Sequence, residues 1–127
     1  KKGVKYLGID LSDTAIKKAR DLHPNSEFKK VDLGPLKNYY NSYDYVFSRD
    51  TLMHQEKPFE FLEELIKCAN KSIILRIRTR DYGATDFNYK TSCQLHYDNF
   101  WMPYIVINID ELINFLNLST PLGDISG

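Results

Sequence analysis

The strongest constraint on the fold is a short apolar segment that ends in a carboxylate, with a helical pattern directly behind it. Residues 7–11 read Leu-Gly-Ile-Asp-Leu, and Ser12 is a suitable N-cap for the residues that follow. The pattern predicts a strand and then a helix, as in an α/β nucleotide-binding domain. Asp10 is expected just past the carboxyl end of the strand, where open α/β sheets bind ligands. Its two oxygens can accept hydrogen bonds from both hydroxyls of a ribose.

The segment before Asp10 is as informative as the acid. In dinucleotide-binding domains a glycine-rich loop precedes this acid by about 20 residues, whereas this chain starts at Lys1. We therefore expect the chain to be the middle of a domain.

Composition limits the class of protein. The 127 residues are about one domain in length, and 43% of them are hydrophobic, which is enough for a core. The 17 basic and 17 acidic residues cancel, so no nucleic-acid-binding surface is expected. No segment approaches the roughly 18 apolar residues of a membrane span. Cys68 and Cys93 lack the spacing of a metal site, so we expect no metal and a reducing, cytoplasmic setting.

Strand and helix patterns alternate along the chain. This alternation predicts parallel βαβ units with right-handed crossovers. The apolar run at residues 72–77 predicts a strand that is buried on both faces. Glu111, three residues after Asn108, marks the start of the last helix. The expected strands cover residues 4–9, 27–31, 43–48 and 72–77, and the expected helices begin near Ser12, Pro58 and Asn108.

Residues 80–103 interrupt the alternation with a long stretch rich in aromatic side chains. Loops of this length are usually either functional or disordered. Two interpretations of Tyr97, Phe100 and Trp101 are open: their rings can stack on a planar substrate, or they can cover the apolar edge of a sheet.

Polar residues follow three successive strands of the expected sheet. They are Asp10, Asp32 and the segment Ser48-Arg49-Asp50. Parallel strands bring their carboxyl ends to one edge of the sheet, so one ligand can contact all three places. Asp32 can accept a hydrogen bond from an exocyclic amino group such as that of adenine. The alternative for Asp32 is a turn residue without further function, because turns favour aspartate.

The order and spacing of these segments carry a family resemblance. The series consists of residues 6–12, 15–20, 31–33, 43–54, 61–65 and 73–75. In this series the chain resembles the class I S-adenosylmethionine-dependent methyltransferases over residues 4–79. The resemblance implies an α/β fold, a Rossmann-like three-layer sandwich with a mostly parallel sheet. The family's first strand, its glycine-rich loop and its last two strands have no counterpart here, so we expect the sandwich to be incomplete at both ends.

The resemblance makes residues 1–127 one partial methyltransferase domain. Its nucleotide-binding core is expected at residues 4–79, with an aromatic-rich loop and a final helix at residues 80–127. The implied cofactor is S-adenosylmethionine. In the site that the resemblance implies, Asp10 binds the ribose hydroxyls, Asp32 the adenine amino group, Leu11 and Leu33 the adenine faces, and Ser48 and Arg49 lie under the methionine part.

The implied reaction is an in-line transfer of a methyl group to an unidentified acceptor, which we expect to be a small molecule. The protein has to align the nucleophile and exclude water. His54 is the candidate general base for a hydroxyl acceptor, because the unperturbed pKa of a histidine side chain, roughly 6.5, suits proton transfer near neutrality. Asp50 is the second candidate. Structural interpretations are open as well: His54 can cap a helix or pack against Pro58, and Arg49 can pair with Asp50.

Two other functions compete with methyl transfer. An NAD-dependent oxidoreductase of the Rossmann type also places an acid at the position of Asp10. A non-catalytic domain can keep the methyltransferase fold for interaction with a partner. The second acid, Asp32, and residues 48–54 favour the methyltransferase. The sequence identifies neither the acceptor atom nor the oligomeric state.

Overall fold

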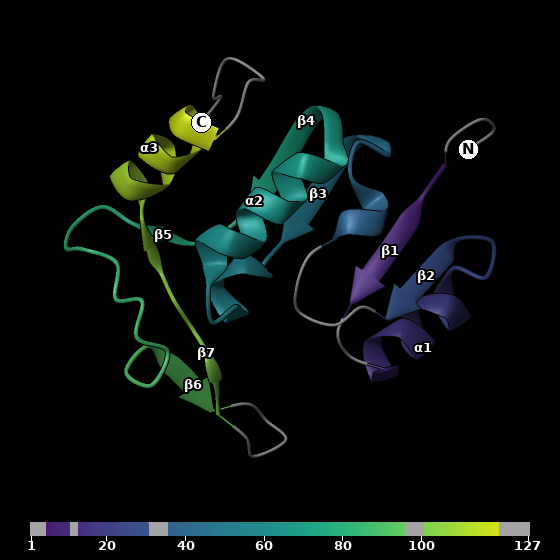
Figure 1. Cartoon of the computed structure of the whole chain (residues 1–127). Coiled ribbons are helices and arrows are strands. Elements are labelled where there is room, and N and C mark those ends of the chain that lie inside the picture. The colour runs from purple at the N-terminus through teal and green to yellow at the C-terminus, as the bar shows by residue number, and fades with distance from the viewer. Residues whose placement is uncertain (1–4, 11–12, 31–35, 96–100, 120–127) are drawn as a thin grey trace. The chain divides into compact units, whose positions relative to one another are not determined.

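The structure is a computed structural model that describes residues 5–10, 13–30, 36–95 and 101–119. The chain divides into two compact units, Lys1–Gly34 and Pro35–Gly127. Each unit is described by itself, and Figure 1 labels the α-helices and most of the strands of both. Helices and short strands occur in both units, which confirms a mixed α/β protein.

The first unit is a βαβ unit. Strands β1 (Leu7–Asp10) and β2 (Glu27–Lys30) pair in parallel, and helix α1 (Asp13–Leu22) connects them. Two parallel neighbours need a crossover of this kind, since a tight hairpin can only join antiparallel strands. The first strand, the first helix and the second strand predicted from the sequence are therefore confirmed.

The interior of the first unit depends on a glycine. Among the described residues of this unit, Ile16 and Phe28 are buried, with 4% and 9% of their surface exposed. Gly8 pairs with Phe28 in the β1–β2 register. A Cβ at position 8 would lie 2.5 Å from Cδ1 of the Phe28 ring, so a larger residue would displace the ring. Tyr6 packs edge-on against the same ring, with the centroids 5.9 Å apart.

The second unit begins with another parallel pair. Strands β3 (Tyr43–Arg49) and β4 (Ala69–Arg76) are hydrogen-bonded neighbours, and helix α2 (Pro58–Cys68) lies between them in sequence. Proline is well suited to the first turn of α2, where its missing N–H would have no partner in the helix. Short 3₁₀ helices flank β3: η1 (Lys37–Tyr39) precedes it and η2 (Leu52–His54) follows it.

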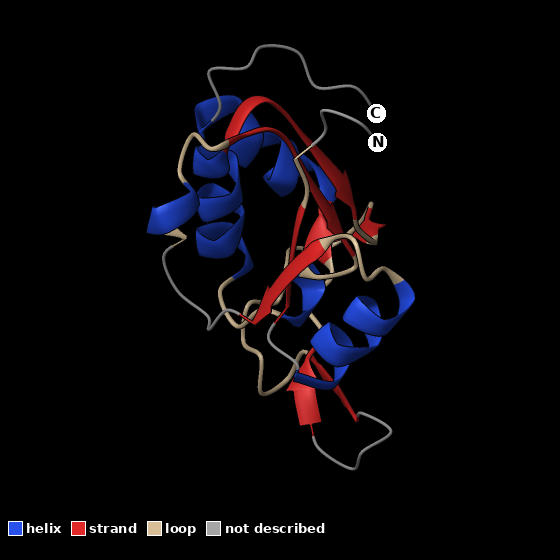
Figure 2. Cartoon of the chain, turned by 90° about the vertical axis from the view of Figure 1, so that its right-hand side faces the viewer, coloured by secondary structure: helices blue, strands red, loops and turns tan. Residues whose placement is uncertain are grey.

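The remaining strands are shorter. Strand β5 (Thr79–Arg80) pairs in parallel with β8 (Ile107–Asn108), and β6 (Cys93–Leu95) pairs antiparallel with β7 (Trp101–Pro103). Helix α3 (Ile109–Ser119) completes the described part of the unit. Figure 2 distinguishes the helices from the strands by colour.

Aliphatic side chains from η2, α2, β8 and α3 form the core of the second unit. Phe59 of α2 and Phe115 of α3 stack at its margin, with ring centroids 4.6 Å apart and planes 9° apart. The contact between the two helices is therefore apolar. The buried members of the core are Leu52, Leu62, Ile66, Ile105, Ile107 and Leu112.

The start of α3 is fixed by side-chain hydrogen bonds. Oδ1 of Asn108 accepts from the N–H groups of Asp110, at 2.9 Å, and Glu111, at 3.3 Å. Asn108 thus satisfies two helix donors that have no partner within the helix, which confirms the predicted start. The Glu111 carboxylate accepts from the hydroxyl and the N–H of Thr85, and these hydrogen bonds lower the pKa of Glu111.

The structure changes three expectations. A three-layer sandwich is not confirmed, because the described strands form four separate pairs, of which three are parallel. The expectation that residues 72–77 are buried on both faces is wrong. The core covers one face only, so half-buried Ile73 and Leu75 alternate with exposed Ile74 and Arg76. Residues 80–103 are not simply a loop, since they include the β6–β7 hairpin.

Candidate active site

Asp10 stands where the sequence predicts it, at the end of β1. It is the last residue of the strand, its side chain is exposed, and Lys30 of β2 is its register partner. Its neighbour Leu11 and the second predicted acid, Asp32, lie outside the described residues, as does Leu33.

The end of β3 forms a sharp turn. Ser48 is buried, with 6% of its surface exposed, whereas Arg49 and Asp50 are exposed. Nε of Arg49 lies 3.7 Å from Oδ2 of Asp50, so the ion pair considered from the sequence is confirmed. Asp50 has a φ of 53°, in the left-handed region that aspartate tolerates better than most residues. Its N–H donates to the carbonyl of Arg76 at 2.8 Å, which anchors the turn to β4.

His54 joins this turn to the β6–β7 hairpin. Its Nδ1 lies 2.9 Å from the carbonyl oxygen of Pro103, and its ring meets that of Tyr104 edge-on at 5.7 Å. A carbonyl oxygen can only accept, so Nδ1 carries a proton and Nε2 is the basic nitrogen of the neutral ring. The N–H of Ile105 donates to the carbonyl of Met53 at 2.8 Å and reinforces the junction.

The predicted site residues therefore fall into two groups. Ser48, Arg49, Asp50 and His54 lie on one short stretch of the second unit, which leads from β3 through η2. Asp10 belongs to the first unit. Each group lies at or directly after the carboxyl end of a parallel strand, the place where α/β proteins bind ligands.

A family model for a methyltransferase domain matches residues 1–117. The chain belongs to this methyltransferase family. The match confirms the resemblance seen in residues 4–79 and extends it through most of α3. Comparisons with curated proteins and with solved structures give no match.

Two further findings concern the described part of the methyltransferase domain. None of its helices is both long enough and apolar enough to cross a membrane. Within the same residues, no group of three or more histidine, cysteine, aspartate or glutamate side chains is arranged to hold a metal ion.

The hydrogen bond of His54 makes a testable contribution to stability. We expect His54→Ala to lower the free energy of unfolding by about 1 kcal/mol, because the Pro103 carbonyl loses its donor. His54→Asn is expected to cost less, since its amide can donate from nearly the position of Nδ1. Urea unfolding of both variants measures the difference. Equal losses would show that the hydrogen bond is not what His54 contributes.

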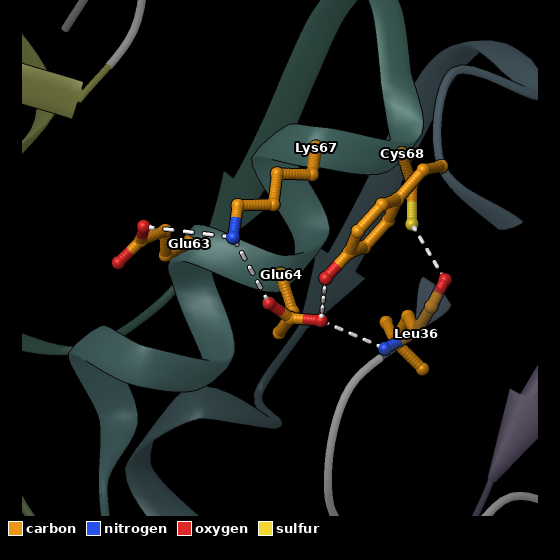
Figure 3. Close-up of polar contacts among 6 residues, drawn as sticks. Leu36, Glu63, Glu64, Lys67 and Cys68 are labelled. Atoms are coloured by element: carbon orange, nitrogen blue, oxygen red, sulfur yellow. Dashed lines mark hydrogen bonds and ion pairs between the residues drawn. The ribbon is translucent and has the colours of Figure 1, made fainter. Parts of the chain in front are cut away.

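A second polar cluster of the methyltransferase domain was not anticipated from the sequence. Oε1 of Glu64 accepts from the hydroxyl of Tyr40 at 2.5 Å and from the N–H of Leu36 at 2.8 Å. Lys67 lies 3.5 Å from Oε2 of the same carboxylate, and the Cys68 thiol donates to the Leu36 carbonyl at 3.9 Å (Figure 3). Together these contacts hold the segment around η1 against α2. The neighbouring pair of Glu63 and Lys67, by contrast, has the i,i+4 spacing that favours an ion pair on a helix, and Nζ of Lys67 lies 3.7 Å from Oε1 of Glu63.

The cluster shifts the pKa of each of its acids. Burial alone would raise the pKa of Glu64, but the hydrogen bonds from Tyr40 and Leu36 and the charge of Lys67 outweigh it, so the pKa is lowered. The Glu64 carboxylate in turn raises the pKa of the Tyr40 hydroxyl to about 12. Burial raises the pKa of the Cys68 thiol to about 11.

The lowered pKa of Glu64 predicts a pH-dependent stability. A carboxylate with a lower pKa in the folded state stabilises the fold above its unfolded pKa, near 4.5, and this contribution is lost as the pH falls through the folded value. We expect Glu64→Gln to lower the free energy of unfolding by about 1–2 kcal/mol at pH 7, and by progressively less as the pH falls below 4.5. Glu63→Gln is the matched control, because its exposed ion pair contributes less than about 1 kcal/mol. A difference in the free energy of unfolding between wild type and Glu64→Gln that stays constant from pH 7 to pH 3 would contradict the lowered pKa of Glu64.

Proposed function

We propose that the protein transfers a methyl group from S-adenosylmethionine to a small-molecule acceptor. The observation that carries the proposal is the family match over residues 1–117, with an acid at the end of the first strand of that region. In the proposed site Asp10 binds the ribose hydroxyls. The two free cysteines, Cys68 and Cys93, support a reducing compartment such as the cytoplasm.

Asp10 and Arg49 each offer a group that one part of this cofactor requires. Asp10 is an exposed acceptor at a strand end, as a ribose diol requires. Arg49, next to the buried Ser48, is an exposed cation at the end of β3 and can bind the carboxylate of the methionine part. Asp32, Leu11 and Leu33 complete the proposed site as the partners of the adenine.

The cofactor, when bound, supplies the electrophilic methyl group, and the residues of the chain position the acceptor and move its proton. For a hydroxyl acceptor, we propose that Nε2 of His54 takes the proton, since the Pro103 carbonyl holds the other ring nitrogen protonated. Asp50 is the alternative base, on the turn just before η2. A normal kcat in His54→Asn would exclude His54 from this role.

The experiment that tests the proposed function is a thermal-shift titration with S-adenosylhomocysteine, with NAD as the comparison ligand. A ligand at 100 times its Kd stabilises the folded state by about 2.7 kcal/mol, which is readily seen in the melting temperature. A rise with S-adenosylhomocysteine alone supports the proposal. A rise with NAD alone would favour an oxidoreductase, and no rise with either ligand would favour a non-catalytic domain.

A further inference from the structure

Arginine is concentrated in one part of the second unit. Four of the five arginines of the chain are Arg49, Arg76, Arg78 and Arg80, and we refer to these four as the arginine cluster. Arg49 ends β3, Arg76 ends β4 and Arg80 ends β5, so the cluster follows the carboxyl ends of three strands. The chain as a whole has no net charge, and the cluster is therefore a local excess.

The register places these side chains close together. Arg49 is the direct partner of Arg76 in the parallel β3–β4 pair, at a spacing of about 4.8 Å between neighbouring strands. From Ile73 to Arg80, half-buried and exposed residues alternate without a break, and all three arginines of this segment are exposed. The three arginines are two residues apart on the exposed side of this segment, which corresponds to about 7 Å wherever the backbone is as extended as in a strand.

The cluster is only partly neutralised by the rest of the chain. Asp50 pairs with Arg49 at 3.7 Å, and Arg80 is one of the groups that lower the pKa of Asp86. Arg76 and Arg78 form no ion pair with any residue in the described part of the chain. Arg49 and Arg76 are directly opposite each other on neighbouring strands, where like charges repel, so an anion beside Arg76 would relieve an unfavourable arrangement.

We propose that Arg76 and Arg78 bind an oxyanion, a carboxylate or a phosphate, of the methyl acceptor. The inference rests on the proposed function and names a substrate class for that site. Guanidinium groups match the planar, two-oxygen geometry of these anions better than any other side chain. The carboxyl ends of parallel strands are also where an α/β enzyme receives its ligands. In this proposal Arg49 binds the carboxylate of the cofactor, whereas its register partner Arg76 and the nearby Arg78 bind the acceptor.

The test is a titration of the full chain with inorganic pyrophosphate at constant ionic strength. The Nε–H signals of the arginines in ¹H–¹⁵N spectra report on each side chain. We expect saturable shifts at Arg76 and Arg78, and an affinity about tenfold lower in Arg76→Gln. Lys71→Gln is the matched control, because Lys71 is an exposed cation near the start of the same strand, 3.8 Å from Asp44. It should change the affinity less than twofold.

Two results would overturn the anion site. One is a shift that grows linearly without saturation, and the other is an equal loss of affinity in Arg76→Gln and Lys71→Gln, since both indicate general electrostatic attraction only. A second titration, in saturating S-adenosylhomocysteine, identifies the source of the anion. Undiminished pyrophosphate binding supports the acceptor. Competition would assign Arg76 and Arg78 to the carboxylate of the cofactor and overturn the inference.

The same pair of titrations separates this inference from the proposed function. If S-adenosylhomocysteine binds and pyrophosphate does not, the function stands and the substrate class is wrong. If pyrophosphate saturates the cluster and S-adenosylhomocysteine does not bind, the methyltransferase activity fails and the assignment to a methyl acceptor fails with it.

Discussion

Asp10→Ala is expected to weaken the binding of S-adenosylhomocysteine about a hundredfold. The carboxylate at the end of β1 is proposed to accept from both ribose hydroxyls, and a hydrogen bond to a charged group contributes about 1.5–3 kcal/mol. Losing two such bonds removes at least 2.7 kcal/mol, or two factors of ten in Kd. Isothermal titration calorimetry of wild type and variant measures the loss directly.

The control for this prediction is Asp21→Ala, which removes an exposed acid near the end of α1 in the same unit. It should leave the affinity unchanged. Asp10→Asn keeps the size of the side chain and half of its acceptors, and should fall between wild type and Asp10→Ala. Melting temperatures of all three variants show whether the fold is intact. An unchanged affinity in Asp10→Ala would exclude the ribose site from this position.

Leu62→Ala is expected to lower the free energy of unfolding by about 2–5 kcal/mol. Leu62 is fully buried in the core of the second unit, where it packs among side chains of η2, β8 and α3. Shortening it to alanine removes apolar contacts and leaves a cavity. Because small domains are stable by only about 5–15 kcal/mol, this single change is a large fraction of the total. Denaturant unfolding followed by circular dichroism measures the change.

Leu118→Ala is the matched control for Leu62→Ala. The chemical change is the same, but Leu118 lies near the end of α3 with 89% of its surface exposed. We expect an effect within about 0.5 kcal/mol. Similar losses in the two variants would mean that the apolar interior of the second unit does not stabilise the fold as its burial indicates.

The sequence predicts the local elements well because their signals are local. The strand that ends at Asp10, the helix that starts at Pro58 and the cap at Asn108 each follow from a few neighbouring residues. The pairing of β1 with β2 and of β3 with β4 also follows, since a helix between two strands favours a parallel crossover.

What the sequence does not predict depends on contacts between distant residues. The antiparallel β6–β7 pair joins Cys93 with Pro103, ten residues further along the chain, which short-range sequence patterns did not indicate. Glu64 accepts hydrogen bonds from Tyr40 and Leu36, which lie 24 and 28 residues away in the sequence, so helical spacing does not predict the polar cluster around Glu64. In the candidate site, Asp10 and the turn after β3 were predicted because strand ends are visible in the sequence. The hydrogen-bond partner of His54, the Pro103 carbonyl, lies 49 residues further along the chain and was not predicted.

The raised pKa of Cys68 makes its thiol a probe for the local unfolding of the polar cluster around Glu64. Its thiol is buried and protonated at neutral pH. A thiol reagent therefore cannot reach the sulfur, and the nucleophilic thiolate that would react with it is not formed. Modification then has to wait until α2 separates from the segment around Leu36. The half-buried Cys93 should react first. The slower second phase, the reaction of Cys68, would then measure the rate of local unfolding of the polar cluster around Glu64 without any added label.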